Sequence, residues 1–146
     1  MKTTTLKMGV ILLFLVFLGI ACEKDEQLPP NQAKGKIIAV TARCYGEIVV
    51  IEVENPKGIG VEGTFGEESN EITYKNAIGV PYFKKTGITA TVPQIVGTWL
   101  YFEYRELTEE EEKGNLFTTE DPLICLMNIG PPTVKRVIIT IIIDFK

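Results

Sequence analysis

Apolar residues along this chain occur in short runs separated by Gly, Pro and Asn, a pattern typical of β-strands joined by turns. Two runs rich in β-branched residues, 36–43 and 47–54, flank Gly46 and predict a β-hairpin. Strand character returns at 71–75 and continues more weakly at 77–80. The chain is therefore predicted to be predominantly β.

The clearest strand is predicted at 98–105, where aromatic, aliphatic and charged residues alternate. Because successive side chains of a strand point to opposite faces, Leu100, Phe102 and Tyr104 share one face. The opposite face carries the other members of the segment, Trp99, Tyr101, Glu103 and Arg105. This alternation predicts a half-buried strand with two aromatic side chains on its polar face.

Four further segments complete the pattern along the chain. Residues 61–70 contain two Gly and one Ser and predict a mostly irregular loop, whereas 86–92 lies between prolines and predicts a short edge strand. We expect a short apolar strand at 123–126 and a long one at 134–144. Because the apolar run in the long strand is nearly continuous, it predicts burial on both faces or a strand with two neighbours.

Helical signals are confined to one segment, 108–114. Thr108 fits an N-cap, Glu111 the third position of a capping box, and Gly114 a helix stop. The four consecutive carboxylates of this segment lack the alternating Asp, Asn and Gly spacing of a calcium loop. We therefore expect a solvated helical turn here and no metal site.

About five substantial strands within about 110 residues, beginning with a Gly-led hairpin and ending in a long apolar strand, resemble the OB-fold, a small Greek-key barrel. The resemblance extends over residues 35–144. It implies one mainly β domain, 35–146, built as a five-stranded barrel with at most one short helix. A β-sandwich of seven short strands is the alternative.

The start of the chain has the form of a secretory signal peptide. Lys2 and Lys7 precede 13 mostly apolar residues, 8–20, and small residues follow. The segment Gly19-Ile20-Ala21-Cys22 resembles the lipobox of bacterial lipoproteins, although Gly19 stands where that family prefers Leu. The resemblance implies a cleaved signal at 1–21 and acylation of Cys22. Cleavage by ordinary signal peptidase at the same bond would leave Cys22 without lipid.

Residues 22–34 are predicted to form the lipidated N-terminus and a flexible tether, because charged, Pro-containing segments bury too little surface to fold. Their acidic cluster, 23–26, resembles the surface-export signal of Bacteroidetes-type lipoproteins. With one compact β domain behind it, the whole chain resembles small lipoproteins of that type. This implies an envelope protein anchored in the outer membrane and displayed outward, or, as the alternative, facing the periplasm.

The net charge and the number of cysteines limit which partners and which covalent links the protein is expected to have. Without Lys2 and Lys7 the mature chain has 13 basic and 19 acidic residues, a net charge of −6, which argues against nucleic acid. Contact with the membrane is therefore expected through the acyl chains. In an oxidising compartment Cys44 and Cys125 predict a disulfide, and two buried free thiols are the alternative.

Several catalytic mechanisms are removed by composition. The chain has no histidine, which excludes Ser-His and Cys-His pairs and His-bound zinc. Its one serine, Ser69, has no nucleophile setting. Paired carboxylates such as Glu52 and Glu103 leave glycoside hydrolysis open. We expect a protein that is not an enzyme and uses no cofactor.

The aromatic residues Trp99 and Tyr101 are the leading candidates for a binding surface, where they could stack on sugar rings or contact a protein. Tyr74 is a further candidate, with Tyr82 and Phe83 behind it. The alternative is that these rings close the barrel end or line its core. The expected function is a non-catalytic binding or accessory module for glycan or protein. Alternatives are a lipoprotein inhibitor or immunity protein that uses a rigid loop within 62–71, and a carboxylate-only glycosidase.

Overall fold

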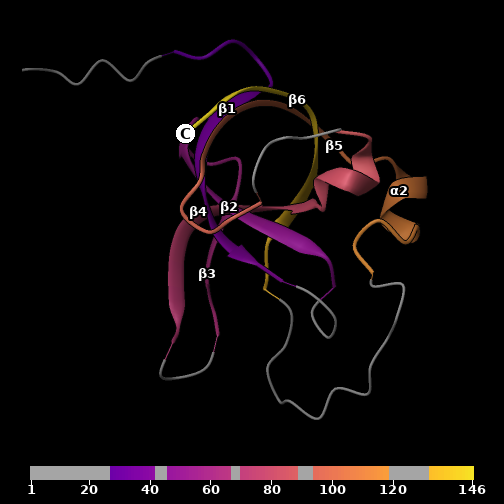
Figure 1. Ribbon diagram of the computed structural model, residues 1–146, viewed down its shortest axis with the longest axis horizontal. Helices are drawn as coiled ribbons and strands as arrows, with labels where there is room; N and C mark the ends of the chain where they lie inside the picture. Colours follow the sequence, from indigo (N-terminus) through magenta and orange to yellow (C-terminus); the bar gives the residue numbers. More distant parts are fainter. Residues whose placement is uncertain (1–26, 42–45, 67–69, 89–93, 119–131) are drawn as a thin grey trace, which may run out of the picture.

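The computed structural model describes residues 27–41, 46–66, 70–88, 94–118 and 132–146, which fold mainly into β-strands (Figure 1). The two helical segments are short, and no helix within these ranges is long and apolar enough to cross a lipid bilayer. The elements are, in chain order, β1 Gln32–Val40, β2 Ile48–Asn55, β3 Val61–Phe65, β4 Ile72–Pro81, η2 Phe83–Thr86, β5 Trp99–Glu106, α2 Glu109–Lys113 and β6 Lys135–Phe145.

Five of the strands close into a barrel. Strand β1 pairs antiparallel with β2 and β5, β2 pairs antiparallel with β4, and β6 joins β4 in parallel and β5 antiparallel. In the order β1-β2-β4-β6-β5 each strand pairs with two neighbours, so the barrel is closed. Strand β3 is an additional strand that pairs with β4. This order and these directions are those of an OB-like Greek-key barrel, as predicted, and the β-sandwich alternative is wrong.

The first strand bends because it belongs to two pairings at once. Residues 32–36 pair with β5, while the strand also pairs with β2 from Lys34 onward. At Gly35 an added Cβ would lie 2.7 Å from the carbonyl oxygen of Glu52 and 2.7 Å from Cγ2 of Ile51. A glycine is needed there because the two backbones approach so closely.

The core forms two clusters on the two sides of β2. Inside the barrel lie the inward residues of all five barrel strands, including Val49, Ile51, Ile78, Leu100, Phe102 and Ile139. On the outer side of β2, Ile48 and Val50 pack with Tyr74, Ala77 and Phe117. The near-continuous apolar run of β2 is thus buried on both faces, which fits its composition.

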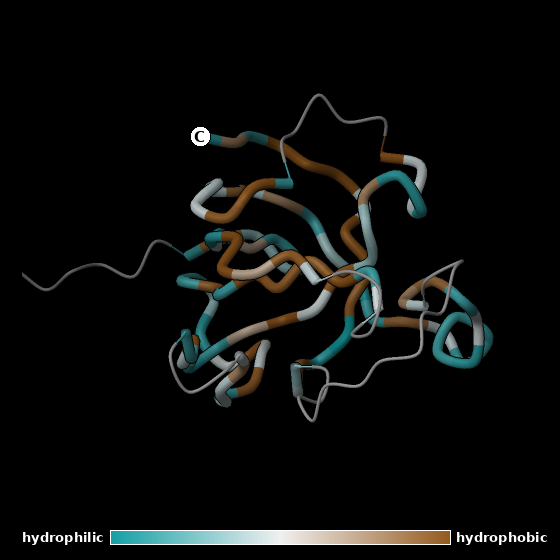
Figure 2. The backbone as a smooth tube through the Cα atoms, turned by 60° about the horizontal axis from the view of Figure 1, so that its bottom comes forward, coloured by the Kyte–Doolittle hydropathy of each residue, from teal (hydrophilic) through white to brown (hydrophobic). Residues whose placement is uncertain are grey.

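Strand β6 is buried over only part of its length. Residues 137–139 are buried, but Ile141 is 52% exposed, and Ile143 and Phe145 are also exposed. Figure 2 shows apolar, brown colouring along much of this strand, with hydrophilic, teal positions near the C-terminus. The prediction of two neighbours is confirmed, since β6 pairs with β5 and, at Lys135 and Arg136, with β4. The prediction of burial on both faces is wrong beyond residue 139.

Other boundaries differ from the sequence-based predictions. Residues 61–65 form β3 rather than an irregular loop, because pairing with β4 supplies its hydrogen bonds, and the two strands project together from the barrel (Figure 1). The domain also begins earlier than 35, since Gln32 to Lys34 already pair with β5. In the predicted edge strand 86–92, Thr86 instead closes η2, and residues 89–92 lie outside the described residues, as does 123–126.

The hairpin of β1 and β2, the strands β4 and β5, and the capped helix are confirmed. Helix α2 has the complete capping box: Thr108 Oγ1 accepts from the Glu111 backbone N–H, and the Glu111 carboxylate accepts from the Thr108 N–H at 2.9 Å. The Arg105 guanidinium holds the same carboxylate at 2.6 and 2.7 Å. This pairing lowers the pKa of Glu111 to about 2.

Candidate functional site

Strand β5 presents Trp99 and Tyr101 on the outer face of the barrel, as its alternation predicts. Leu100 and Phe102 point into the core, whereas Trp99 is 39% exposed and Tyr101 is half-buried. The two rings therefore neither line the barrel core nor close it. They stand next to each other on one face of the strand, which makes them available to a ligand.

Neighbouring strands surround the two rings with charged side chains. In the strand register Lys36 of β1 lies between Glu52 of β2 and Trp99 of β5. Two residues earlier on β1, Lys34 lies beside Tyr101, with its Nζ atom 5.4 Å from the centroid of the ring. On the other side of β5, Asp144 of β6 is opposite Tyr101. Charges of both signs thus flank an aromatic pair.

Two hollows lie on this face and share a wall. The aromatic groove, about 340 Å³ in volume, lies over β5 and the end of β6 and is bordered by Trp99, Tyr101, Lys34, Glu54, Asp144 and Lys146. The polar groove, about 530 Å³, lies over β2 and β4 and is bordered by Trp99, Lys36, Glu52, Glu54, Lys75 and Asn76. Trp99 and Glu54 belong to both grooves, so the two form one extended surface.

Hydrogen bonds fix the orientation of the Tyr101 ring. Its hydroxyl donates to Oε1 of Gln32, and Nε2 of Gln32 donates to Oε1 of Glu103 at 2.9 Å. Because Lys34 also lies over the ring, the aromatic side chain is held from its tip and from one face. A ring held in this way loses little conformational entropy when a ligand stacks on it.

The wall of the polar groove is also preorganised. Nδ2 of Asn76 donates to the carbonyl oxygens of Val53 at 2.8 Å and Pro56 at 3.1 Å, and its Oδ1 accepts from the Gly60 N–H at 2.7 Å. Beside it, the Lys75 N–H donates to Oε1 of Glu52 at 3.2 Å. These contacts join the turn after β2 to the middle of β4.

The carboxylate pair considered for catalysis does not converge. Glu52 lies opposite Lys36 of β1, whereas Glu103 lies opposite Gln32. Four residues along a strand separate these positions by about 13 Å. Glycosidases place their two carboxyl groups about 5 to 9.5 Å apart. Glu52 and Glu103 therefore do not form a glycosidase pair.

Tyr74, Tyr82 and Phe83 do not contribute to the aromatic surface. Tyr74 is only 1% exposed, its hydroxyl donates to the Thr133 carbonyl at 3.0 Å, and burial raises its pKa. Phe83 is buried in the barrel core, and the Tyr82 hydroxyl donates to the Thr41 carbonyl at 2.5 Å. Phe117, far along the chain, packs against the Tyr74 cluster, so local sequence gave no signal of this burial.

The charged members of the two grooves were not predicted from the sequence. Lys34 and Lys36 occupy alternate positions of β1, and Glu52 and Glu54 occupy alternate positions of β2. That spacing of two was the available signal for one shared face. Asp144 and Lys146 had no such signal, because their place beside Tyr101 and Trp99 depends on the pairing of β6 with β5.

Exposed apolar side chains concentrate next to the aromatic groove. Within the described residues, all large exposed hydrophobic side chains lie in two segments, at Ile95, Val96, Trp99, Ile141, Ile143 and Phe145. The segments meet where the backbones of Trp99 and Lys146 exchange hydrogen bonds of 2.9 and 3.0 Å. Concentrations of this kind mark interaction surfaces.

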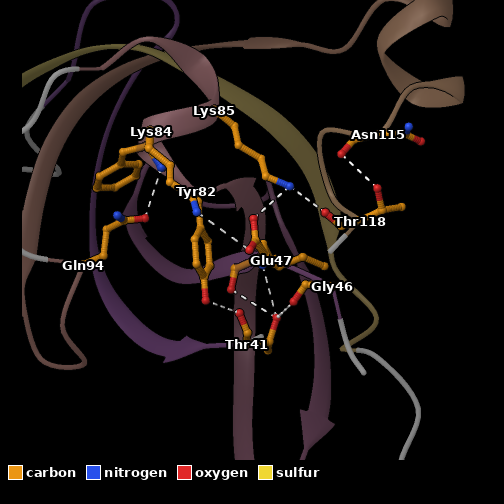
Figure 3. A network of polar contacts seen from close by, with 11 residues as sticks. Thr41, Gly46, Glu47, Tyr82, Lys84, Lys85, Gln94, Asn115 and Thr118 are labelled. Carbon is orange, nitrogen blue, oxygen red and sulfur yellow. Dashed lines mark hydrogen bonds and ion pairs between the residues drawn. The ribbon is translucent and has the colours of Figure 1, made fainter. Parts of the chain in front are cut away.

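A separate polar cluster joins the short helix η2 to two loops at another part of the barrel (Figure 3). The Glu47 carboxylate pairs with Nζ of Lys85 at 2.8 Å and lies 3.9 Å from Nζ of Lys84. Lys85 also donates to the Thr118 carbonyl at 2.5 Å. The hydrogen bond from Lys85 lowers the pKa of Glu47. Because each polar group contacts another loop of the protein, this cluster is a structural clamp.

No protein-family model matches this chain, and no curated protein matches it either. The cysteines predicted to carry lipid or form a disulfide, Cys22, Cys44 and Cys125, lie outside the described residues. Over the ranges that are described, the structure contains no group of three or more acidic or cysteine side chains placed to hold a metal ion. The face around Trp99 and Tyr101 is therefore the site on which a functional proposal rests.

Proposed function

We propose that the protein is a lipid-anchored lipoprotein of the cell envelope whose barrel binds a glycan without catalysing a reaction. The observation that carries this proposal is the aromatic groove, where Trp99 and the fixed ring of Tyr101 are bordered by Glu54, Asp144 and Lys146. Sugar rings have apolar C–H faces and a rim of hydroxyl groups. An aromatic platform with charged hydrogen-bonding groups around it matches both features.

The fold and the carboxylate geometry support binding over hydrolysis. Ligands of OB-type barrels, including oligosaccharides, bind over the second and third barrel strands, which are β2 and β4 here, and the polar groove lies over these strands. The wide separation of Glu52 and Glu103 argues against these two residues as the acid and base of a glycosidase.

The proposed location rests on the sequence around Cys22. A signal peptide at 1–21, acylation of Cys22 and the acidic cluster within 23–26 would place the barrel outside the outer membrane on a short tether. Such a protein would meet external glycans at the cell surface. If the barrel faces the periplasm instead, its ligand would be a glycan of the envelope.

The glycan-binding proposal is tested with the full chain, expressed with its signal and purified from membranes in detergent. Retention on a panel of immobilised acidic and neutral polysaccharides is compared between wild type and Trp99→Ala. Because central aromatic contacts dominate binding, we expect Trp99→Ala to weaken retention at least about tenfold.

The matched control is Ile95→Ala, which removes an exposed apolar side chain that borders neither groove. Its retention should equal that of wild type. Equal retention by Trp99→Ala, or retention on none of the polysaccharides, would refute the proposed function. Capture of a protein that is lost in the Ile95→Ala variant would assign the exposed apolar side chains to a protein partner instead.

The anchor is tested in cells by labelling with palmitate. Wild type should take up label and sediment with membranes, and Cys22→Ala should do neither. Protease treatment of intact cells then distinguishes the two orientations, because digestion of labelled protein means outward display and protection means a periplasmic barrel. Labelling of Cys22→Ala would contradict acylation at this residue.

A further inference from the structure

We infer that the glycan is an acidic, linear oligosaccharide that lies across β5, β1, β2 and β4, with Trp99 under a sugar ring and anionic groups at Lys36 and Lys75. This inference rests on the proposed function and names its ligand class. It follows from three features of the outer face. These are the net charge of the two grooves, the presence of lysines that are not paired with a carboxylate, and the order of residues across the strands.

The charge of the two grooves is opposite in sign to that of the chain. The whole sequence has a net charge of −4. The side chains that border the grooves include five lysines, Lys34, Lys36, Lys57, Lys75 and Lys146, against three carboxylates, Glu52, Glu54 and Asp144, a net charge of +2. A positive surface on an acidic protein attracts anions locally while the rest of the protein repels them.

Among the described residues, the basic side chains outside the grooves are already engaged in contacts within the protein. In the described ranges, Lys84, Lys85, Arg105, Lys113 and Lys135 each lie within 4.0 Å of a carboxylate, and Arg136 lies over the ring of Phe117. Lys36 and Lys75 are exposed, and among the described residues neither ammonium group is paired with a carboxylate. These two cations are therefore available to a ligand.

The available cations lie on strands beside the aromatic platform: Lys36 is directly opposite Trp99, and Lys75 is two residues from Ala77, the partner of Glu52. Across the sheet the order is Trp99 on β5, Lys36 on β1, Glu52 on β2 and Lys75 on β4, with Lys75 placed by the hydrogen bond from its backbone N–H to Glu52. Three strand spacings cover about 14 Å along the sheet. That length suits a short linear oligosaccharide rather than a single sugar.

The carboxylates between the cations set the spacing of the ligand's charges. Glu52 separates Lys36 from Lys75, and Glu54 borders both grooves. A ligand with an uninterrupted run of negative charge would place some of it against these carboxylates, whereas a glycan whose acidic groups are separated by hydroxyl groups would not. Glu52 and Glu54 can accept hydrogen bonds from such hydroxyl groups. The arrangement therefore favours a uronate-type or sparsely sulfated glycan over a dense polyanion.

The experiment uses the full chain, purified from membranes in detergent, and isothermal titration with soluble probes. The acidic probes are polygalacturonate, alginate, hyaluronate and chondroitin sulfate, and the neutral probes are fully methyl-esterified polygalacturonate, dextran and laminarin. We expect at least one acidic probe to bind roughly tenfold more tightly than every neutral probe. That preference should shrink as salt is raised, because exposed ion pairs are screened.

Variants assign the preference to the two lysines. The double variant Lys36→Gln, Lys75→Gln should lose roughly tenfold in affinity for the acidic probe and keep wild-type thermal stability, because both side chains are exposed. The matched control, Lys113→Gln, removes an exposed lysine of α2 that lies outside both grooves and should bind like wild type. Trp99→Ala should lose binding of acidic and neutral probes alike.

The outcomes separate this inference from the proposed function. If neutral probes bind as tightly as acidic ones, or if the double lysine variant binds like wild type, the inference is wrong and the glycan-binding proposal stands. If no probe of either kind binds, both are wrong. If linear polyphosphate displaces the acidic probe and Trp99→Ala still binds it, the surface recognises charge alone, and the inference is again wrong.

Discussion

The Nζ atom of Lys34 lies 5.4 Å from the centroid of the Tyr101 ring, on the face of the barrel where Trp99 is exposed. The two residues are direct neighbours in the pairing of β1 with β5. With the Tyr101 hydroxyl bound to Gln32, this contact places an oriented aromatic ring beside Trp99. The candidate site thus depends on a strand pair as well as on the aromatic residues themselves.

Two substitutions at Tyr101 separate its ring from its hydroxyl. Tyr101→Phe keeps the ring and the contact with Lys34 but loses the hydrogen bond to Gln32, so we expect a stability loss of about 1 kcal/mol and nearly unchanged glycan binding. Tyr101→Ala removes the stacking surface and should weaken binding about tenfold. Titration calorimetry and urea unfolding measure the two effects. Wild-type binding by Tyr101→Ala would exclude this ring from the site.

Substitution of Tyr74 should affect stability and not binding. Its hydroxyl donates to the Thr133 carbonyl within a buried cluster, so Tyr74→Phe should lower the free energy of unfolding by about 1 kcal/mol. Glycan affinity should stay at the wild-type value, because Tyr74 is only 1% exposed. A tenfold change in affinity with unchanged urea unfolding would instead show that Tyr74 takes part in glycan binding.

Asn76 should be a strong determinant of stability for a polar residue. Asn76→Ala breaks three hydrogen bonds that connect β4 to the turn after β2, and at about 1 kcal/mol each we expect a loss of about 2 to 3 kcal/mol. The matched control is Asn115→Ala at an exposed position. Thr118 donates a hydrogen bond to the backbone carbonyl of Asn115, which the substitution keeps. Its effect should stay within about 0.5 kcal/mol. Urea unfolding of both variants makes the comparison, and equal effects would contradict the assigned role.

The clamp around Glu47 predicts an acid-dependent loss of stability. The hydrogen bond and charge of Lys85, with a smaller contribution from Lys84, lower the pKa of Glu47, and Tyr82 also faces this carboxylate. Because the folded pKa lies below the ordinary value of 4.5, the stabilisation is fully present above that pH and is lost as pH falls through the folded pKa.

Glu47→Gln should therefore flatten the dependence of unfolding free energy on pH below about 4.5. Glu111 and Glu106, whose pKa values are also lowered, account for part of the slope that remains. The control Glu110→Gln changes an exposed carboxylate of α2 and should leave the curve unchanged. Urea unfolding between pH 3 and 7 measures the unfolding free energy as a function of pH. If Glu47→Gln and wild type show the same slope, the clamp does not cause the loss of stability in acid.

Much of the fold could be predicted because its signals are local. The alternation of Leu100, Tyr101 and Phe102 gives the two faces of β5, and the spacing of Thr108 and Glu111 gives the capped helix. Strand β3 could not be predicted in this way. It has five residues, none of them buried, and it is a strand because β4 supplies its backbone partners. Its stability comes from a pairing that its own composition does not require.

The sequence by itself determined most of the strand segments, β3 excepted, and that Trp99 and Tyr101 share one face of β5, because these properties depend on the two-residue period of the chain. Only the tertiary structure decided that Tyr74 is buried and that Lys36 and Lys75 line one surface with Trp99. These facts depend on the cover provided by Phe117 and on the register of four strands. Burial and proximity are set by residues far along the chain, and the period of a single strand carries no information about them.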